Sequence, residues 1–397
     1  EDGIRDIGVT GVQTCALPIC PLANAARSVG KASDIGSSGS VILGEGMGMR
    51  RLGARTPLRG VRELYAIGSM KTLKRILLGV LAALALLWAA LTAWAYWPPA
   101  MPGVPAASLA TAADKWVTVD GLRLRYREWG EAGAGRPDIL LIHGFGNSLQ
   151  SFRGLAPALA GCCHVVAIDM PGYGLSDKPV DHDYHNGPQA LVLVAAAKRL
   201  GLRRVVYAGH SLGGAVALQA AVRDPDAGGL VLMNPGIIRT GVPKIVQVTL
   251  PPLPRMSAKM FGDRGFRGGF LRKSYVHPEI VTEQVVDEVM LGARTDDYMA
   301  GMTSLMTQYS EGEEIALAPQ VKVPTLIPWG DRDRNKPLSE ADELQRLIPG
   351  SRLVHFAEAG HYVHEEATAG VARAIEDWLR AVMPAVPSTV PTDTKGA

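Results

Sequence analysis

Six short apolar runs follow one another between residues 138 and 356, and helical patterns separate most of them. The runs read DILLI, HVVAI, RVVYAG, GLVLM, PTLIPW and RLVHF, without the strict alternation of a strand that has one exposed face. Such runs are typical of parallel strands buried on both faces. The intervening segments ALVLVAAAKRLG and GGAVALQAAVRDP place apolar residues three or four positions apart, as helices do. The pattern therefore predicts an α/β fold with a mostly parallel, doubly wound sheet.

A hairpin and a long interval without strand pattern complete this body. WVTV and LRLRYREW flank Asp120-Gly121, a dipeptide that favours a two-residue turn between antiparallel strands. Between the fourth and fifth runs, EIVTEQVVDEVMLGA and DDYMAGMTSLMTQY have helical spacing. An interval this long needs structure of its own. We therefore predict a body at residues 116–382 with a helical cap inserted at residues 237–320.

An apolar segment, Ile76–Trp97, precedes the body and has Thr92 as its one clearly polar side chain. It supplies the roughly 20 residues that a helix needs to cross a bilayer. Three basic residues come directly before it. By the positive-inside rule we predict a transmembrane signal-anchor at residues 70–98, with the body on the extracytoplasmic (periplasmic) side. The alternative is a cleaved signal peptide ending at Ala93-Trp94-Ala95, but its apolar region would ordinarily be only about 7–15 residues long.

The remaining segments are predicted to have little structure of their own. Residues 1–46 include VTGVQTCALPI, which reads like translated sequencing adapter, so we expect a non-native or disordered extension. Met70 is the expected natural start, with Met47 and Met49 as the alternatives. Residues 99–115 are rich in Pro and Ala and predict a linker. Residues 383–397 are rich in Pro and Thr and predict a disordered tail.

Charge and cysteine usage narrow the function classes further. Residues 1–115 hold 12 Lys or Arg against 7 Asp or Glu, whereas the remainder holds 29 against 31. The nearly neutral body gives no support for nucleic-acid binding. Within it, Cys162 and Cys163 are adjacent, and neighbouring cysteines rarely bridge because the ring strains the peptide between them. We expect a buried structural role for both and no disulfide.

One motif carries a candidate nucleophile. Gly209-His210-Ser211-Leu212-Gly213 follows an apolar run and precedes a helical segment. The pattern G-x-S-x-G in a strand–turn–helix context indicates a nucleophile elbow, a strained turn that holds a serine hydroxyl above a sheet. Glycines at the two outer positions let this turn close without a Cβ clash. Ser211 is therefore predicted to be the nucleophile.

A serine hydroxyl needs a base to take its proton, and the base needs a carboxylate to orient it. His361 follows the last apolar run, whereas His364 lies three residues further on, entering a predicted helix. WGDRDRNKP follows the preceding run and offers Asp331 and Asp333. We prefer His361 as the base. We also prefer Asp333, because Asp331 sits directly after the turn and is better placed to order the loop. In an α/β sheet these strand ends share one edge.

The negative charge that develops on the substrate's carbonyl oxygen also needs hydrogen-bond donors to stabilise it. The segment HGFG follows the first apolar run, so the backbone N–H groups of Phe145 and Leu212 are predicted to form the oxyanion hole. His143 is expected to hold this loop by bonding the backbone, and Asp169 to order a neighbouring loop. The other motif-supporting positions are Gly144, Gly209, His210 and Gly213. No metal-ligand cluster or phosphate-binding loop accompanies these motifs, so we expect neither metal nor cofactor.

Together, HGFGNS, DMPGYGLSD, GHSLGG and the order Ser, Asp, His resemble the α/β-hydrolase superfamily over about residues 116–382. Serine at position 211 argues against the epoxide hydrolase and haloalkane dehalogenase branches, which use Asp there. The anchor and cap look like those of membrane-anchored esterases and monoacylglycerol lipase-like members. NKP after Asp333 departs from the more usual apolar pair before that Pro.

The resemblance implies a membrane-anchored serine hydrolase that cleaves carboxylic esters through an acyl-enzyme. Its partners would be the membrane and a small-molecule ester or lipid. Methionines concentrated in the cap suit an adaptable pocket for apolar acyl chains. The same triad also serves C–C bond hydrolases, perhydrolases and some peptidases. The rival from another class is a catalytically idle binding protein on this fold.

Overall fold

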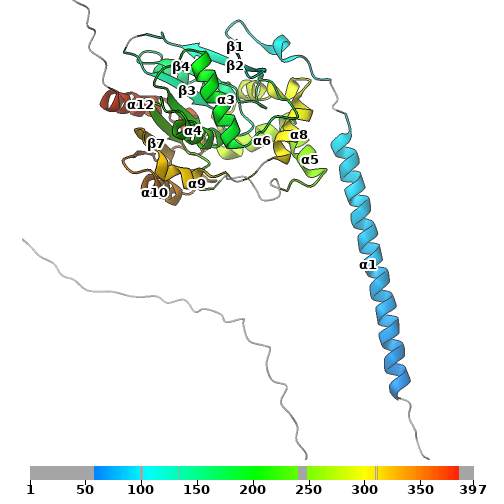
Figure 1. Ribbon diagram of the computed structural model, residues 1–397. Helices are drawn as coiled ribbons and strands as arrows, with labels where there is room; N and C mark the ends of the chain where they lie inside the picture. The colour runs from blue at the N-terminus through cyan, green and yellow to red at the C-terminus, as the bar shows by residue number, and fades with distance from the viewer. Residues whose placement is uncertain are drawn as a thin grey trace, which may run out of the picture. The chain divides into compact units, whose positions relative to one another are not determined.

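An eight-stranded sheet forms the centre of the body, in the order β1-β2-β4-β3-β5-β6-β7-β8 (Figure 1). The computed structural model describes residues 58–98, 102–133, 135–239, 248–308, 310 and 312–383. The predicted extension at residues 1–46 and the predicted tail beyond residue 383 lie outside these residues. The strands are β1 (Lys115–Val119), β2 (Leu122–Trp129), β3 (Asp138–Ile142), β4 (His164–Ile168), β5 (Val206–His210), β6 (Gly229–Met233), β7 (Thr325–Gly330) and β8 (Arg352–Phe356).

The pairing of the strands confirms the mostly parallel sheet. β2 runs antiparallel to β1 and β4, and the other neighbouring strands pair in parallel. Between β1 and β2, Asp120 and Gly121 both have positive φ (49° and 85°), as a tight two-residue hairpin turn requires. Val119 therefore pairs directly with Leu122.

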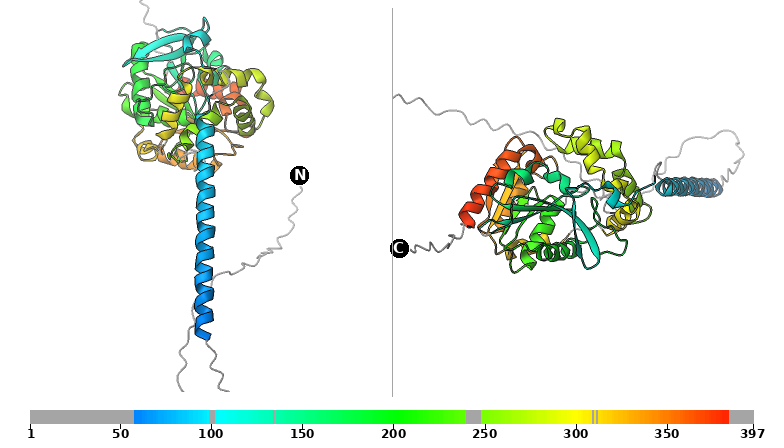
Figure 2. Two further views of the ribbon diagram at one scale, coloured as in Figure 1. Left: turned by 90° about the vertical axis from the view of Figure 1, so that its right-hand side faces the viewer. Right: turned by 90° about the horizontal axis from the view of Figure 1, so that it is seen from above.

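Helices cover both faces of the sheet, and the layers can be followed in Figures 1 and 2. Side chains from alternate positions of each inner strand enter different cores. On one face Leu140 and Ile142 pack in the core that includes α3 (Asn186–Arg199), α4 (Leu212–Arg223) and α10 (Leu338–Leu347). On the other face Ile139 and Leu141 pack in the core that includes α2 (Leu155–Leu159) and α12 (Thr368–Val382). Because both faces are buried, these strands are apolar at nearly every position.

Helices fill the described part of the interval between β6 and β7, where the cap was predicted. They are α5 (Leu253–Phe261), α6 (Arg264–Ser274), α7 (Glu283–Val289), α8 (Tyr298–Thr307) and α9 (Glu314–Leu317). Residues 240–247, 309 and 311 of the predicted cap lie outside the described residues. A separate apolar cluster joins Leu271 of α6 and Val285 of α7 to Tyr362, which follows His361 in the chain. This cluster packs the cap against the loop that carries the predicted base.

The apolar segment near the N-terminus is helical. Helix α1 spans Leu58–Tyr96, and its portion Ser69–Tyr96 has a mean hydropathy of 2.5. Among the helices of the described residues, α1 is the one that is long and apolar enough to cross a membrane. A signal sequence can meet the same criteria of helix length and hydropathy, so these features identify the helix only as a candidate membrane span.

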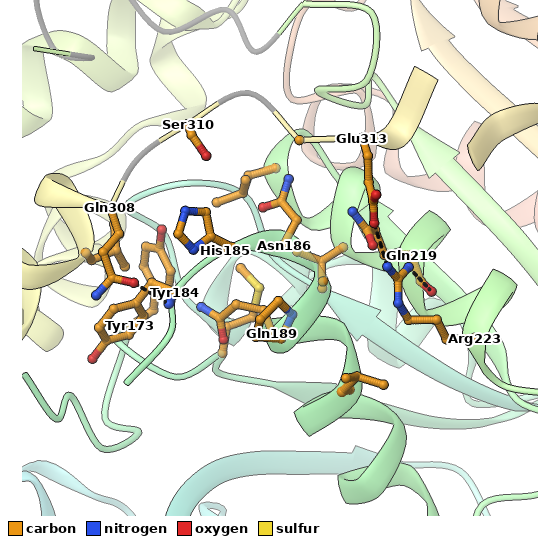
Figure 3. A pocket seen from close by; sticks show the side chains of 18 residues that line it. Tyr173, Tyr184, His185, Asn186, Gln189, Gln219, Arg223, Gln308, Ser310 and Glu313 are labelled. Atoms are coloured by element: carbon orange, nitrogen blue, oxygen red, sulfur yellow. Dashed lines mark hydrogen bonds and ion pairs between the residues drawn. The ribbon is translucent and has the colours of Figure 1, made fainter. Parts of the chain in front are cut away.

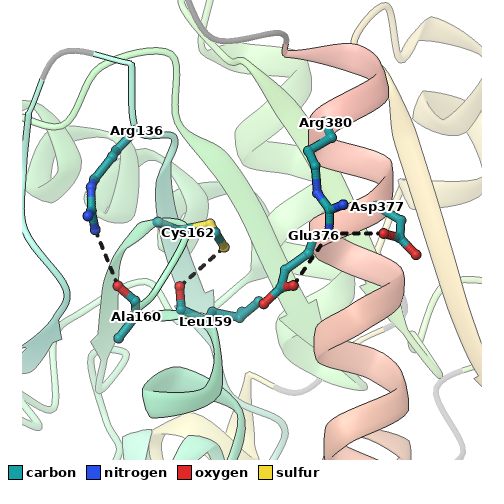
Figure 4. The surroundings of a disulfide bond; sticks show 8 residues. Arg136, Leu159, Ala160, Cys162, Glu376, Asp377 and Arg380 are labelled. Carbon is teal, nitrogen blue, oxygen red and sulfur yellow. Dashed lines mark hydrogen bonds and ion pairs between the residues drawn. A yellow bond between two sulfur atoms is a disulfide. The ribbon is translucent and has the colours of Figure 1, made fainter.

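The expectation of two separate cysteines is wrong in this structure. Cys162 and Cys163 are joined by a disulfide (Figure 4). They lie in the turn between α2 and β4, where the backbone N–H groups of both residues donate to the carbonyl of Leu159. The bond lies before β4, at the opposite end of that strand from the catalytic candidates.

Two short helices complete this side of the body. η2 (Leu149–Phe152) follows β3, and α11 (Val363–Glu366) follows β8 and the histidine loop. Ser151 of η2 and His364 of α11 meet in the interior, where the hydroxyl of Ser151 lies 2.7 Å from Nε2 of His364. This contact joins the segment that follows β3 to the segment that follows β8 in the interior of the body.

Candidate active site

Ser211 occupies the turn between β5 and α4 in a strained conformation. Its φ is 53° and its ψ is −119°, a combination that residues with a Cβ rarely adopt. The turn is also too tight for side chains on either side. A Cβ at Gly209 would lie 2.0 Å from the carbonyl oxygen of Gly213, and one at Gly213 would lie 2.2 Å from that of Ile142. The two glycines of the motif are therefore required by contact distance.

The structure brings Ser211, His361 and Asp333 together. Nε2 of His361 lies 3.0 Å from Oγ of Ser211, within reach of the hydroxyl proton. On the other side of the ring, Nδ1 of His361 lies 2.7 Å from Oδ2 of Asp333. A carboxylate only accepts, so Nδ1 carries the proton and Nε2 is left as the acceptor for the serine. This is the geometry that lets a histidine act as a general base.

Asp333 is held as a charged acceptor by several donors. The backbone N–H groups of Asn335 and Lys336 donate to Oδ1, at 2.8 and 3.1 Å. The side-chain amide of Asn234 donates to Oδ2 at 2.9 Å. Burial works to raise the pKa of Asp333, but the charge and hydrogen bond of His361, with the other donors, hold the pKa below its usual value. The carboxylate is therefore ionised wherever the protein is folded near neutral pH.

The two rejected candidates lie elsewhere. Oδ1 of Asp331 lies 2.9 Å from Nδ1 of the exposed His355, so its carboxylate orders that loop. His364 is buried behind the site, against the hydroxyl of Ser151. Burial, together with the charges of Arg153 and His361, lowers the pKa of His364 to about 3. A histidine that stays neutral and faces away from Ser211 has no direct path to its proton.

A cavity of about 70 Å³ opens at the triad. Gly144, Phe145, Ser211, Leu212 and His361 line it, so both predicted oxyanion donors belong to residues at its wall. The segments that carry these residues come from the ends of β3, β5 and β8. Parallel strands present these ends at one edge, which explains why residues more than 200 positions apart in the chain share a cavity.

A family model described as the α/β-hydrolase fold matches residues 137–368, more than half of the chain. The chain belongs to the α/β-hydrolase family. Lipase 1 of Psychrobacter immobilis is 28% identical over 257 residues, covering 62% of this chain and 77% of the lipase. An uncharacterised hydrolase of Bacillus subtilis is 26% identical over 268 residues, covering 66% of this chain and 96% of its own.

A solved structure of a membrane phospholipase A is also similar. It is 27% identical, has a TM-score of 0.57, and the match covers 79% of this chain and all of that one. These similarities support a hydrolase with lipase-like and esterase-like relatives. They also agree with the fold and the superfamily that the sequence motifs indicated.

Two further histidines of the hydrolase support the loops around the site. Nε2 of His143 accepts from the backbone N–H of Met170 at 3.2 Å, so its Nδ1–H donates to the carbonyl of Gly144 at 2.9 Å. Nε2–H of His210 donates to the carbonyl of His361 at 2.9 Å. Burial lowers the pKa of both imidazoles, that of His210 most strongly, and keeps them neutral. This geometry fits the supporting roles predicted for both residues.

Asp169 lies in the loop-ordering position expected for it. Its two oxygens accept from the backbone N–H groups of Leu149 (2.7 Å) and Leu175 (2.8 Å). Nε of Arg125 lies 2.7 Å from Oδ2, with both side chains fully buried. The carboxylate therefore ties the loop after β4 to the segment after β3.

The sequence motifs did not single out three residues that contact the site. Asn234, directly after β6, has a φ of 41° and holds both Asp333 and the backbone N–H of Gly330. Its place after a strand run, at the same edge as the triad, was a usable signal. Lys336 lines the cavity, and burial lowers the pKa of its ammonium. Arg267 of α6 reaches from the cap and donates to the carbonyl of Gly146 at 2.5 Å.

Proposed function

We propose that this protein is a membrane-anchored serine hydrolase that cleaves carboxylic esters with apolar acyl groups. The hydrogen-bonded chain from Ser211 through His361 to Asp333, with Ser211 in the strained elbow conformation, carries the proposal. Lipase and phospholipase relatives support the choice of an ester bond.

The proposed reaction follows from the positions of these groups. His361 takes the hydroxyl proton as Oγ of Ser211 bonds to the ester carbonyl carbon. Backbone N–H groups of Phe145 and Leu212 receive the charge that develops on the carbonyl oxygen. His361 then gives its proton to the departing alcohol, which leaves an acyl-serine. Water, activated by the same imidazole, releases the acid and restores the serine.

We propose an apolar acyl group because of the residues that the cap places near the site. A second, smaller cavity shares Phe145 with the triad cavity. Aromatic and aliphatic side chains dominate its wall, including Phe261, Val289, Tyr298 and Met302. Because burying apolar surface is favourable and Met adapts its shape, this side suits an acyl chain.

The anchor is proposed from the Ser69–Tyr96 segment and the basic residues before its apolar core. With the body on the extracytoplasmic side, the full chain should stay in membranes after an alkaline carbonate wash. Protease added to spheroplasts should digest the body. Release of a shortened body into the soluble fraction would instead identify the segment as a cleaved signal peptide.

Substitution of the nucleophile tests the central step. The Ser211→Ala variant should lose hydrolysis of p-nitrophenyl butyrate by a factor on the order of 10⁶ in kcat, and a fluorophosphonate probe should label only the wild-type protein. Ser176, a buried serine that donates to the carbonyl of Asp169, is not expected to be labelled in either protein. Full activity of Ser211→Ala in a clean preparation would disprove the mechanism. Absence of both labelling and hydrolysis in the wild type would favour an idle binding protein.

A further inference from the structure

The smaller cavity that shares Phe145 with the triad cavity contains buried positive charge. Arg267 of α6 lines this cavity with an exposed fraction of 1%, and an arginine stays protonated at any ordinary pH. Lys178, also buried, lines the same cavity, whereas no acidic residue of the described part of the chain does. The cavity therefore combines a mostly apolar wall with two cations.

The two cations differ in their partners. The ammonium of Lys178 donates to the carbonyl of Ser176 at 3.0 Å and lies 3.2 Å from Oδ1 of Asp297, so a carboxylate balances its charge. Nη2 of Arg267 donates to the carbonyl of Gly146. Its Nη1 is buried and has no hydrogen-bond partner in the part of the chain that the structure describes. Arg267 is therefore a buried cation with a donor to spare.

The groups around this guanidinium exclude water without balancing its charge. Its central carbon lies 5.4 Å from the ring centre of Phe261 and 5.6 Å from that of Phe270. Aromatic faces attract a cation but carry no net charge. The phenol of Tyr362 is neutral as well, because burial raises its pKa despite the opposing charge of Arg267. Since burying a charge without a counter-charge is strongly unfavourable, these surroundings favour an anion beside Arg267.

We propose that this cavity binds one chloride ion, with Nη1 of Arg267 as the main donor. Its volume is about 20 Å³. A cavity of about 10–15 Å³ already holds a water molecule, and chloride is only a little larger. Because Nη2 is engaged by Gly146, one nitrogen is left for the ligand. That suits a monatomic ion better than a carboxylate, which arginine ordinarily binds through two parallel hydrogen bonds.

The ion acts on the reaction through the loop that follows β3. Gly146 has a φ of 64°, and a Cβ there would lie 3.1 Å from Nη2 of Arg267, so this loop is shaped to receive the guanidinium. Phe145, the proposed oxyanion donor, directly precedes Gly146. An ion that holds Arg267 in place therefore also holds this donor. The effect on catalysis rests on the proposed function, whereas binding of the ion does not.

Thermal unfolding of the full chain in detergent micelles tests binding without a substrate. Sodium chloride is compared with sodium gluconate at the same ionic strength, so that charge screening is equal and only the anion differs. At a hundredfold excess over its Kd, chloride should raise Tm by about 5 °C. Crystals soaked in bromide should show an anomalous scattering peak beside Nη1 of Arg267.

A variant of Arg267 and a matched control assign the effect to this site. Arg267→Gln removes the charge and keeps a donor, so its Tm should be the same in both salts. Arg272→Gln, in the same helix, loses a side chain that pairs with Glu283 at the surface, and it should keep the full response to chloride. If Arg267→Gln does not fold, the Tm response and the bromide position in the wild type still decide.

The effect on catalysis has its own measurement. In gluconate, kcat of the wild type for p-nitrophenyl butyrate should fall severalfold, because the oxyanion loop is held less firmly. The acyl chain is proposed for the same side of the site, so the ion shortens the space available to it. Chloride should therefore lower kcat/KM for p-nitrophenyl octanoate relative to that for the butyrate.

Equal Tm values of the wild type in chloride and gluconate would overturn the proposal, as would bromide bound only elsewhere. A rise in Tm with sodium formate but not with chloride would also overturn it, and would make the cavity a carboxylate site. Failure of the proposed function is distinct, because hydrolysis would then be absent while chloride still raised Tm.

Discussion

The edge of the sheet and the cap contribute to the site in different ways. At the edge, Ser211, Asp333 and His361 each lie one to five residues beyond a strand, and backbone or buried side-chain hydrogen bonds hold them. In the cap, Arg267 projects from the first turns of a helix and reaches the site across packed aromatic rings. At the edge, the ends of the strands determine where the side chains of the site lie. In the cap, a side chain reaches the site only if it lies on the helix face that packs inward.

We expect this difference to separate the proposed chemistry from the selection of substrates. At the edge lie the hydrogen-bonded hydroxyl, imidazole and carboxylate, which the proposed mechanism uses with any ester substrate. The cap supplies Phe261, Tyr298 and Met302 to the smaller, apolar cavity, and residues near its end, such as Ser310 and Glu313, line a cavity of about 280 Å³ beside α3 and α4 (Figure 3). Changes at the edge should therefore affect all substrates alike, while changes in the cap should alter rates according to substrate.

After replacement of the nucleophile itself, the largest effect is expected for Asp333→Asn at the edge. Without the carboxylate, His361 loses the acceptor that fixes its tautomer and stabilises the imidazolium, so kcat should fall by about 10³–10⁴ with a small change in KM. Steady-state kinetics on p-nitrophenyl butyrate measures both. Asp331→Asn is the control, since its carboxylate contacts His355, and it should retain near wild-type kcat. A larger loss in Asp331→Asn would reverse the assignment of the acid.

The next effect is on the free energy of unfolding, which should depend on pH through the buried His364. His364 has a folded pKa of about 3 against an ordinary 6.5, so below pH 6.5 the unfolded chain takes up a proton that the folded protein refuses. The stability associated with neutral His364 is full above pH 6.5 and is lost as the pH falls toward 3. Between pH 7 and pH 4 this loss should be about 3 kcal/mol.

Urea unfolding at these two pH values tests the prediction with His364→Gln. The variant should lose less stability on acidification than the wild type, although His210, whose pKa is also lowered, keeps part of the slope. His355→Gln is the control for the same substitution at an exposed histidine outside the interior. Equal acid sensitivity in wild type and His364→Gln would show that another group is responsible.

The same contrast explains what the sequence could predict. The triad follows from position, because apolar runs locate the strands and the strand ends locate Ser211, His361 and the Asp331/Asp333 pair. Choosing between those two acids needed only an argument about reach. Arg267 could not be found this way, since it is one of several basic residues in the first half of the cap. Packing alone distinguishes it, at 1% exposed, from Arg264 and Arg272 of the same helix, which remain solvent-accessible.

The Cys162–Cys163 bond was also missed. Local geometry argues against a bridge between neighbouring cysteines, yet these two residues, in the turn between α2 and β4, are bonded. The cavity of about 280 Å³ likewise draws its wall from α3, α4 and the segment before α9, which no single motif connects. Motifs thus predict the residues that meet at the sheet edge better than they predict the cavities around them.

The smallest effect is expected where the cap touches the edge. Arg267 donates to the carbonyl of Gly146, one residue after the predicted oxyanion donor Phe145. Arg267→Ala should let this loop shift and lower kcat about tenfold with little change in KM. That is less than the 10²–10³ expected for loss of an oxyanion donor itself, because the arginine acts through the loop.

Arg267→Lys should restore part of the rate, since an ammonium still donates to the carbonyl. Arg272→Ala is the matched control in the same helix, where the side chain pairs with Glu283 at the surface. A rise in KM with unchanged kcat would instead assign Arg267 to substrate binding, and the cap would then touch the substrate directly rather than shape the edge.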